Sequence, residues 1–340
     1  MPKLRTHRGG RPDTALSIDA RELGNLKWEL YRATDFTNPI LLDESIEATQ
    51  AATGHDVDSC TDTILLQDLI FRLVTRFALS GNGADFDHIV SVGRRGVQLL
   101  ADSGLDRTMC IYQLHKLLRR HLSSVVKLED VDCDVVASQC VIDIRSDDDP
   151  KKPEALYHYS NKLLTRFWAH DKPEDLENAI AARSRAVELE EDDQSDKPSH
   201  LTELGSLLHL RFVHGHEVSD LEQAILYHEL AVKLTLDGDS DKPRRYRNLG
   251  DSLNGRYKHS NDPEDLERAI LCYTRAIALV HEDDPSKAEL CHVLGHLTRS
   301  RFEQTGSLQD LDQDISWHTQ SVELTPDYHR SKPRAVRVRF

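Results

Sequence analysis

The sequence predicts an all-α protein, a right-handed α-solenoid of about seven helix pairs with a 45-residue period. The segments LGSLLHLRF, LGDSLNGRY and LGHLTRSRF begin at Leu204, Leu249 and Leu294, so similar helices recur at a constant spacing. Within one such unit, a break at 260–263 separates two segments that both carry apolar residues at helical spacing. A constant period of this size is typical of stacked supersecondary units rather than of one globular core.

Two further markers hold the same register along the chain. An Arg-aromatic pair stands seven residues after the leading residue, as in Arg256-Tyr257. An Asp followed by an apolar residue stands sixteen after it, as in Asp265-Leu266. Six units share this register and are led by Leu69, Leu114, Tyr159, Leu204, Leu249 and Leu294. The sequence therefore predicts six consecutive copies of one structural unit.

The N-terminal units depart from this pattern. The unit led by Leu114 has His121-Leu122 in place of the Arg-aromatic pair. A shorter seventh unit precedes the others, with the markers Leu23-Gly24 and Asp35-Phe36. We therefore expect degenerate repeats at 17–152 and regular repeats at 153–338 that end in a truncated unit.

Each unit is predicted to contain two amphipathic helices. In the first helix, Leu249, Leu253 and Tyr257 recur every four residues and form one stripe. The apolar positions of the second helix are Leu266, Ala269, Ile270, Tyr273, Ala276, Ile277 and Val280. This spacing follows the i, i+3, i+4, i+7 rule for a helix with one buried face.

Capping residues are expected at the helix boundaries. Asp262 is predicted to cap the second helix, with Pro263 at its first position and Asp265 three residues later. Comparable arrangements are Ser307 with Asp310 and Asn38 with Pro39. The gaps between units are predicted at Asp-Lys-Pro 196–198 and 241–243 and at Ser-Lys-Pro 331–333.

Composition limits the possible functions. The 340 residues carry a formal net charge of -15, which argues against non-specific binding to nucleic acid or to an anionic membrane. No apolar run reaches the ~20 residues of a membrane span, and no signal-type stretch follows the basic start at 1–16, which we expect to be a flexible tail. We therefore expect a cytoplasmic protein with six reduced cysteines, of which Cys272 and Cys291 are predicted to be small core residues.

The small residues of the repeat resemble a known family. Leu-Gly in the first helix, followed by Ala269, Tyr273 and Ala276 in the second, resembles the tetratricopeptide (TPR) pattern, with Tyr246 in place of its Trp and Pro326 in place of its closing Pro. The longer period resembles the kinesin-light-chain type. The set Leu-Gly, Arg-Phe, Asp-Leu, Ala-Ile, Asp-Lys-Pro most resembles the arrays of fungal TPR proteins, many of which carry a C-terminal caspase-like CHAT domain. No CHAT domain is present in this sequence, so the resemblance implies a helical array and no catalytic residues.

No catalytic, cofactor-binding or metal site is predicted. The motifs HExxH, GxSxG and GxxxxGKS are absent, so we expect no enzyme and no cofactor. The stretch 237–241 begins like a calcium loop, but Lys242 stands where that loop needs Gly. Acidic clusters such as 190–193 are interpreted as solvated turns. His292 and His296, four apart on one helix, could share a metal, but no third ligand is visible nearby, so we interpret them as exposed side chains.

The Arg of the Arg-aromatic pair permits two interpretations. It could belong to a ladder of basic contacts for a ligand, or it could form an ion pair with the Asp nine residues later and tie the two helices of one unit together. Because Arg and Asp recur together, the structural interpretation is favoured.

The concave face of the array is the predicted binding surface. Positions five and two before the leading Leu, and two and five after it, are expected to face this side. The candidate contacts there are Arg244, Arg247, Asn254, His292, His296 and Arg299. Because Arg can grip a carboxylate with two hydrogen bonds, an acidic peptide is a suitable ligand, although a merely solvated helix face would show the same residues.

We therefore predict a non-catalytic scaffold that binds a peptide or protein, and neither nucleic acid nor membrane, in the groove of a TPR solenoid. The alternative is a sensor or regulatory arm of a caspase-like CHAT protease system, truncated or acting in trans.

Overall fold

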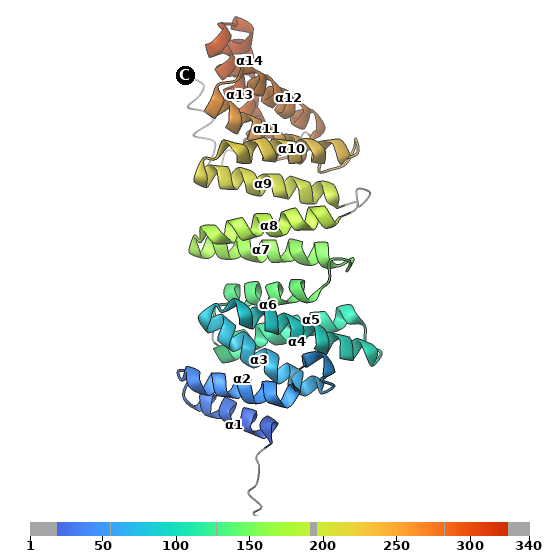
Figure 1. Ribbon diagram of the computed structural model, residues 1–340. Helices are drawn as coiled ribbons and strands as arrows, with labels where there is room; N and C mark the ends of the chain where they lie inside the picture. The colour runs from blue at the N-terminus through green and yellow to red at the C-terminus, as the bar shows by residue number, and fades with distance from the viewer. Residues whose placement is uncertain (1–18, 55, 127, 191–195, 282, 326–340) are drawn as a thin grey trace, which may run out of the picture. The chain divides into compact units, whose positions relative to one another are not determined.

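The computed structural model describes residues 19–54, 56–126, 128–190, 196–281 and 283–325. These residues form helices joined by turns, and no strand occurs among them. The all-α prediction is confirmed (Figure 1). The chain divides into two compact units, Met1–Asp149 and Pro150–Phe340, which are described one at a time.

Unit 1 contains three helix pairs. Its helices are α1 (Ala20–Ala33), α2 (Pro39–Thr53), α3 (Thr63–Ser80), α4 (Gly83–Asp102), α5 (Arg107–His121) and α6 (Asp130–Ile144), with a 3-10 turn η1 (Val57–Ser59) and a π-helical segment η2 (Leu122–Val126). Helices α1 and α2, α3 and α4, and α5 and α6 pack as pairs.

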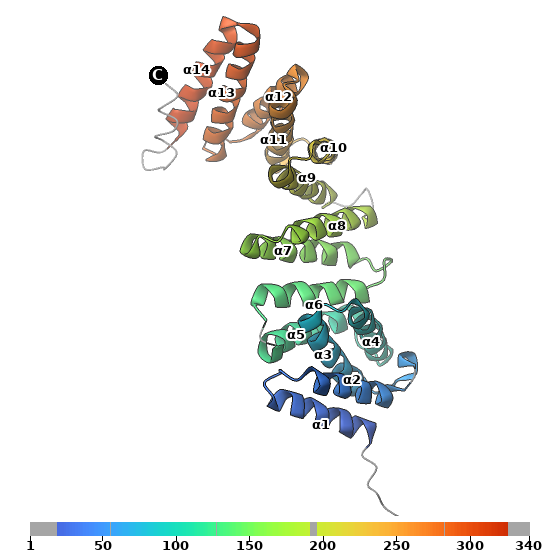
Figure 2. The ribbon, with the colours of Figure 1, turned by 60° about the vertical axis from the view of Figure 1, so that its left-hand side comes forward.

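Unit 2 contains four helix pairs, which brings the described residues to the predicted seven. Its helices are α7 (Lys152–His170), α8 (Pro173–Leu189), α9 (Lys197–Gly215), α10 (Val218–Leu234), α11 (Lys242–Ser260), α12 (Pro263–Leu279), α13 (Ser286–Thr305) and α14 (Leu308–Leu324). The second helices α8, α10, α12 and α14 begin 45 residues apart, and each packs against its first helix (Figure 2). One 45-residue period therefore corresponds to one helix pair.

The core of unit 2 follows the predicted stripes. Leu253, Tyr273, Ala276 and Leu294 are fully buried in a cluster formed by α11, α12 and α13. Small residues are required where the paired helices touch. A Cβ atom on Gly250 would lie 2.8 Å from Cε2 of Tyr273, so glycine lets the two helices approach.

Two of the predicted caps are confirmed and one is wrong. Asp262 accepts a hydrogen bond from the backbone N–H of Glu264 at 3.0 Å, and Asn38 accepts one from Ile40 at 3.2 Å. Ser307 occupies the N-cap position of α14, but its side chain makes no capping hydrogen bond. Its expected partner Asp310 instead binds Arg301, and for the same reason Asp265 does not complete a capping box at Asp262.

The Asp-Lys-Pro motifs begin helices rather than fill gaps. Lys197 and Lys242 are the first residues of α9 and α11, where a proline in the first turn leaves no hydrogen bond unmade. Both lysines are buried and donate from Nζ to a backbone carbonyl of the preceding helix pair, Lys242 to Thr235 at 2.6 Å. The motif thus joins one pair to the next. Pro326 and the motif at 331–333 lie outside the described residues.

The degenerate N-terminal units differ from the regular ones in their turns. Asp35 and Phe36 lie in the turn between α1 and α2, with φ of 49° and 60°, so they do not occupy the second-helix position that the spacing suggested. His121 replaces the repeated Arg and is buried against Phe71, and its ring nitrogen lies 2.8 Å from the hydroxyl of Thr75. Burial lowers the pKa of His121 to about 4.

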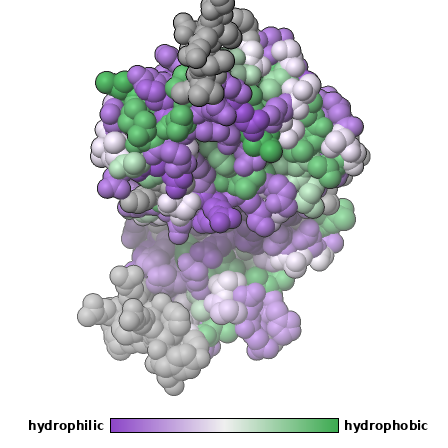
Figure 3. Space-filling model, turned by 90° about the horizontal axis from the view of Figure 1, so that it is seen from below, coloured by the Kyte–Doolittle hydropathy of each residue, from purple (hydrophilic) through white to green (hydrophobic). Residues whose placement is uncertain are grey.

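All six cysteines are buried free thiols, as expected for Cys272 and Cys291. No described helix combines the length and apolar character that a membrane span requires. Exposed apolar side chains include Leu26 and Leu30 on α1, and the face seen in Figure 3 carries hydrophobic areas interspersed with hydrophilic ones.

Candidate functional site

The repeated arginines are structural. In five of the units the guanidinium donates to the Asp nine residues later, across the two helices of one pair. The pairs are Arg76–Asp85, Arg166–Asp175, Arg211–Asp220, Arg256–Asp265 and Arg301–Asp310. The carboxylates are buried, with side-chain exposures between 2% and 9%. These residues are therefore committed within the fold, and the structural interpretation is confirmed.

The three candidate groove arginines are also paired with acids of this chain. Arg244 contacts Asp241 at 3.2 Å, and Arg247 donates to Glu289 on the next first helix at 2.8 Å. Arg299 donates from Nε to the buried Asp314 at 2.9 Å. The positive charges that were expected to bind a carboxylate ligand are thus already neutralised by neighbouring acidic side chains.

The remaining candidates lie in two separate places. Asn254 lines a cavity between α9 and α11. His292 and His296 lie on α13 with their Nε2 atoms 3.3 Å apart. The ring of His318 on α14 lies beside this pair, with its centroid 5.2 Å from that of His292 and 4.9 Å from that of His296, although the ring nitrogens of the three do not all lie within 4.8 Å of one another.

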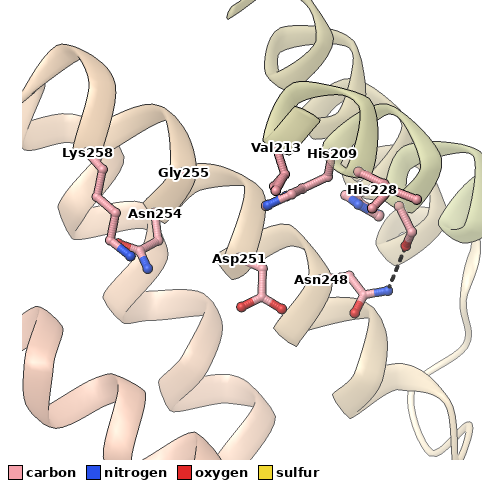
Figure 4. Close-up of a pocket in the computed structure, with 10 residues that line it drawn as sticks. His209, Val213, His228, Asn248, Asp251, Asn254, Gly255 and Lys258 are labelled. Atoms are coloured by element: carbon pink, nitrogen blue, oxygen red, sulfur yellow. Dashed lines mark hydrogen bonds between the residues drawn. The ribbon is translucent and has the colours of Figure 1, made fainter. Parts of the chain in front are cut away.

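The cavity between α9 and α11 has a volume of about 420 Å³ and a lining that combines polar and apolar surface (Figure 4). It is lined by Ser206, His209, Leu210, Val213, His228, Asn248, Asp251, Asn254, Gly255 and Lys258. Helices α9 and α11 provide all of these side chains except His228, which belongs to α10. The cavity therefore lies between neighbouring first helices.

The mouth of the cavity carries available polar groups. Asn254 and Lys258 make no hydrogen bond or ion pair with the described residues, and Asn248 makes only a long 3.4 Å hydrogen bond to Ser206. Lys258 follows Asn254 by four residues on α11, so their side chains share one face of the helix. Amide donors and acceptors and one uncompensated ammonium are thus presented together.

His228 and Asp251 also line the cavity, and the surroundings of each shift its pKa. His228 lies under Gly205, where an added Cβ would meet the imidazole at 2.7 Å. Burial, with a smaller contribution from His209, lowers the pKa of His228 to about 3, and its Nδ1 has no hydrogen-bond partner among the described residues. Burial also raises the pKa of Asp251, which accepts a hydrogen bond from the Tyr273 hydroxyl.

One contact beside the cavity resembles part of a nucleophilic pair. His209 Nδ1 lies 3.1 Å from the hydroxyl of Ser252. Ser252 is fully buried, however, so this contact presents no accessible nucleophile. The groups that remain accessible are suited to binding by hydrogen bonds and charge.

Unit 1 contains a second, mainly apolar cavity of about 540 Å³ between α3, α4 and α5. Leu66, Ile70, Val97 and Met109 are among its lining residues, and Gly96 leaves open space above α4. This cavity was not predictable from the sequence, because it depends on how α5 packs against the two preceding helices.

The second helices also place one large polar side chain each in the core, which was not predicted from the sequence. Arg183, His228, Tyr273 and His318 are the eleventh residues of α8, α10, α12 and α14, and all are buried. Aligning the units at 45 residues places these large polar residues at one core position. Large polar residues are unusual at a helix interface, so this aligned position could have been recognised from the sequence.

No family model and no curated protein matches the sequence. Among solved structures, the chain is similar to YrrB, described as a TPR protein with an unusual peptide-binding site, at 13% identity over 66% of this chain and 89% of that one, with a TM-score of 0.43. It is similar to the MamA protein at 13% identity over 64% and 98%, with a TM-score of 0.42. It is similar to yeast Tom70 at 14% identity over 99% of this chain and 66% of that one, with a TM-score of 0.30.

These likenesses concern helical-repeat architecture, so what the cavity can bind is judged from the residues of this chain. Its described residues form helix pairs with a 45-residue period, joined within each regular pair by a buried Arg–Asp contact and by close packing over a small residue. The described residues form an array of two-helix repeats.

Proposed function

We propose that this protein is a non-catalytic scaffold that binds an extended segment of a partner polypeptide in the cavity between α9 and α11. The observation that supports this most strongly is that Asn254 and Lys258, at the mouth of this cavity, make no hydrogen bond or ion pair with the described residues. In a chain of net charge -15, most other cations near this face are already paired. Such groups gain most from a ligand that supplies the missing partners.

The spacing of these groups suits an extended chain. Asn248 and Asn254 are six residues apart, a rise of about 9 Å along a helix, and three residues of an extended peptide span about 10 Å. Both asparagines could therefore exchange hydrogen bonds with the peptide backbone. Lys258 lies a further ~6 Å along α11 and would meet a carboxylate, either a side chain or the C-terminus of the partner. The acidic preference is thus assigned to Lys258 rather than to the three arginines.

The experiment is a selection from a random peptide library displayed on phage, with the wild-type chain as bait. Selected peptides should bind the Asn254→Ala and Lys258→Ala variants at least ~10-fold more weakly, because each loses a direct contact. Thr274→Ala, an exposed position on α12, is the matched control and should bind as the wild type does. Peptides that bind all four proteins equally would place the site elsewhere.

Nothing among the described residues favours the alternative, a sensor arm of a caspase-like protease system, over a free-standing scaffold.

A further inference from the structure

Three positions of the repeat recur in every helix pair of unit 2. They are the residues two before and two after the leading residue of the first helix, and the eleventh residue of the second helix, which we call the cross-helix triad. The four triads are Tyr157, Asn161 and Arg183; Thr202, Ser206 and His228; Arg247, Asp251 and Tyr273; and His292, His296 and His318. In the first of them the Arg183 guanidinium lies 4.1 Å from the Tyr157 ring centroid and donates to Asn161 at 2.8 Å.

The last triad consists entirely of histidines. The Nε2 atoms of His292 and His296 are 3.3 Å apart, and their ring centroids are separated by 4.6 Å. The His318 ring completes the triangle, at 5.2 and 4.9 Å from the other two centroids. His318 is 4% exposed, whereas His296 reaches the surface. Solvent therefore has access to a cluster whose third member is buried.

The pair of α13 and α14 also carries a buried carboxylate at a position where the other three pairs of unit 2 carry alanine. Asp314 is fully buried and lies one helical turn before His318, at the position held by Ala179, Ala224 and Ala269 in the other pairs. Its Oδ2 accepts from Arg299, so this charge pair is neutral overall. Its Oδ1 lies 3.0 Å from His318 Nε2, but neither atom has a hydrogen bond of good geometry. Unmet polar atoms at such depth are costly unless a ligand reorganises them.

We propose that His292, His296 and His318 bind one divalent transition-metal ion, with Zn²⁺ as the most suitable, and that Asp314 orients His318. In a tetrahedral zinc site with Zn–N distances near 2.0–2.1 Å, two ligand nitrogens are about 3.3 Å apart, which is the separation seen for the pair on α13. Rings bound through one nitrogen then have centroids about 5 Å apart. All three observed separations are close to that value.

Binding requires the His318 ring to turn. With its Nε2 3.0 Å from Oδ1 of Asp314, the nitrogen left for the metal is Nδ1, which has to be turned toward His292 and His296. A carboxylate that holds the other ring nitrogen of a ligating histidine fixes its tautomer and orientation. The exposed side of His296 leaves the fourth position to water or to a partner side chain. This inference does not depend on the peptide cavity between α9 and α11.

The competing explanation is a histidine cluster held only by hydrogen bonds and stacking. The chain offers an internal reference for it, because His228 occupies the same register as His318, and the other two positions of its triad are Thr202 and Ser206 instead of histidines. A tyrosine is accommodated at this register over Gly250, so replacement of either histidine by Tyr preserves a side chain that the fold already accepts.

The test measures Zn²⁺ binding by calorimetry and Co²⁺ binding by visible absorption, with the full-length chain free of any affinity tag. The wild type should bind one ion per chain and give the intense visible bands of tetrahedral Co²⁺. His296→Gln and His318→Tyr should weaken binding at least ~10-fold and abolish those bands, whereas His228→Tyr should match the wild type.

Circular dichroism of each variant separates loss of a ligand from loss of the fold. If His318→Tyr does not fold, His292→Gln and His296→Gln, which change side chains nearer the surface, decide the question. Absence of stoichiometric binding by the wild type would overturn the proposal. Equal binding by the wild type and the His296→Gln variant would overturn it as well.

Discussion

Arg256 on α11 donates from Nε and Nη2 to the two carboxylate oxygens of Asp265 on α12, at 2.8 and 2.6 Å. The Asp265 side chain is 3% exposed and that of Arg256 is 25% exposed. The same two-point contact recurs in the pairs that contain α7 and α9, and in the pair that contains α13 the same two nitrogens of Arg301 donate to Oδ1 of Asp310. A bidentate contact of this kind fixes the angle as well as the distance between two helices, which explains why both residues keep their spacing in every regular unit.

Removing one partner of this contact should destabilise the array. Asp265→Ala leaves the Arg256 guanidinium without its acceptors, and we expect the free energy of unfolding in urea to fall by about 2–3 kcal/mol. Glu188→Ala removes an exposed i, i+3 pair with Arg185 and should change stability by less than ~0.5 kcal/mol. Equal losses for the two variants would show that the buried contact contributes no more than a surface pair.

Two glycines of α11 should respond to Ala in opposite ways. Ala generally stabilises a helix interior by up to ~1 kcal/mol relative to Gly. At Gly250 the new methyl would lie 2.8 Å from the Tyr273 ring, so Gly250→Ala should lower the melting temperature despite that gain. At Gly255 the nearest atom is 3.4 Å away, so Gly255→Ala should be neutral or stabilising. Thermal unfolding followed by circular dichroism distinguishes the two, and a stabilising Gly250→Ala would contradict the close approach of α11 and α12.

Overpacking at the second helix gives an independent test of the register. Ala276 is fully buried in the core of unit 2, so Ala276→Leu should cost about 1–3 kcal/mol. The neighbouring Arg275 is exposed, although it contacts the Tyr246 ring and hydroxyl. Arg275→Ala should therefore lose only ~0.5 kcal/mol. Urea unfolding of both variants should show the difference, and comparable losses would mean that the helix is rotated.

Stability should fall between pH 7 and pH 5, in part because of His228. Its pKa in the folded chain, about 3, lies below the ~6.5 of an unfolded histidine, so the unfolded chain binds the proton first. This contribution is complete above pH ~6.5 and is lost as the pH drops below that value. Over the interval from pH 7 to pH 5, the wild type should lose about 2 kcal/mol more than the His228→Tyr variant. Parallel losses, measured by urea unfolding at both pH values, would show that His228 titrates normally in the folded chain.

Features that depend on residues close in sequence were predictable. The 45-residue period, the helix pairs, the cap at Asp262 and the Arg256–Asp265 contact all follow from short spacings repeated several times. A repeated pair of charges nine residues apart has few other geometric explanations. The turn at Asp35 and Phe36 was missed because it occurs once, in a unit of a different length, so the register could not be checked against a neighbour.

The candidate site was predicted only in part, because its chemistry depends on contacts between helix pairs. The helix face was inferred from periodicity, and Asn254 does line the cavity there. The partner of Arg247 is 42 residues away, and that of Arg299 lies on the second helix at a position that is Ala in the other units of this region. A single sequence shows which residues share a face but not which charges on that face already have partners.

Charge exchange between Lys258 and a bound peptide tests the proposed function most directly. The measurement is a double-mutant cycle on a selected peptide, in which Lys258→Glu is combined with replacement of the acidic group of the peptide by a lysine. Each single change should weaken binding at least ~10-fold, and the combination should recover most of that loss, because the two charges would again be opposite. Independent, additive effects of the two changes would contradict binding of a carboxylate at Lys258, and no loss from Lys258→Glu alone would contradict the site itself.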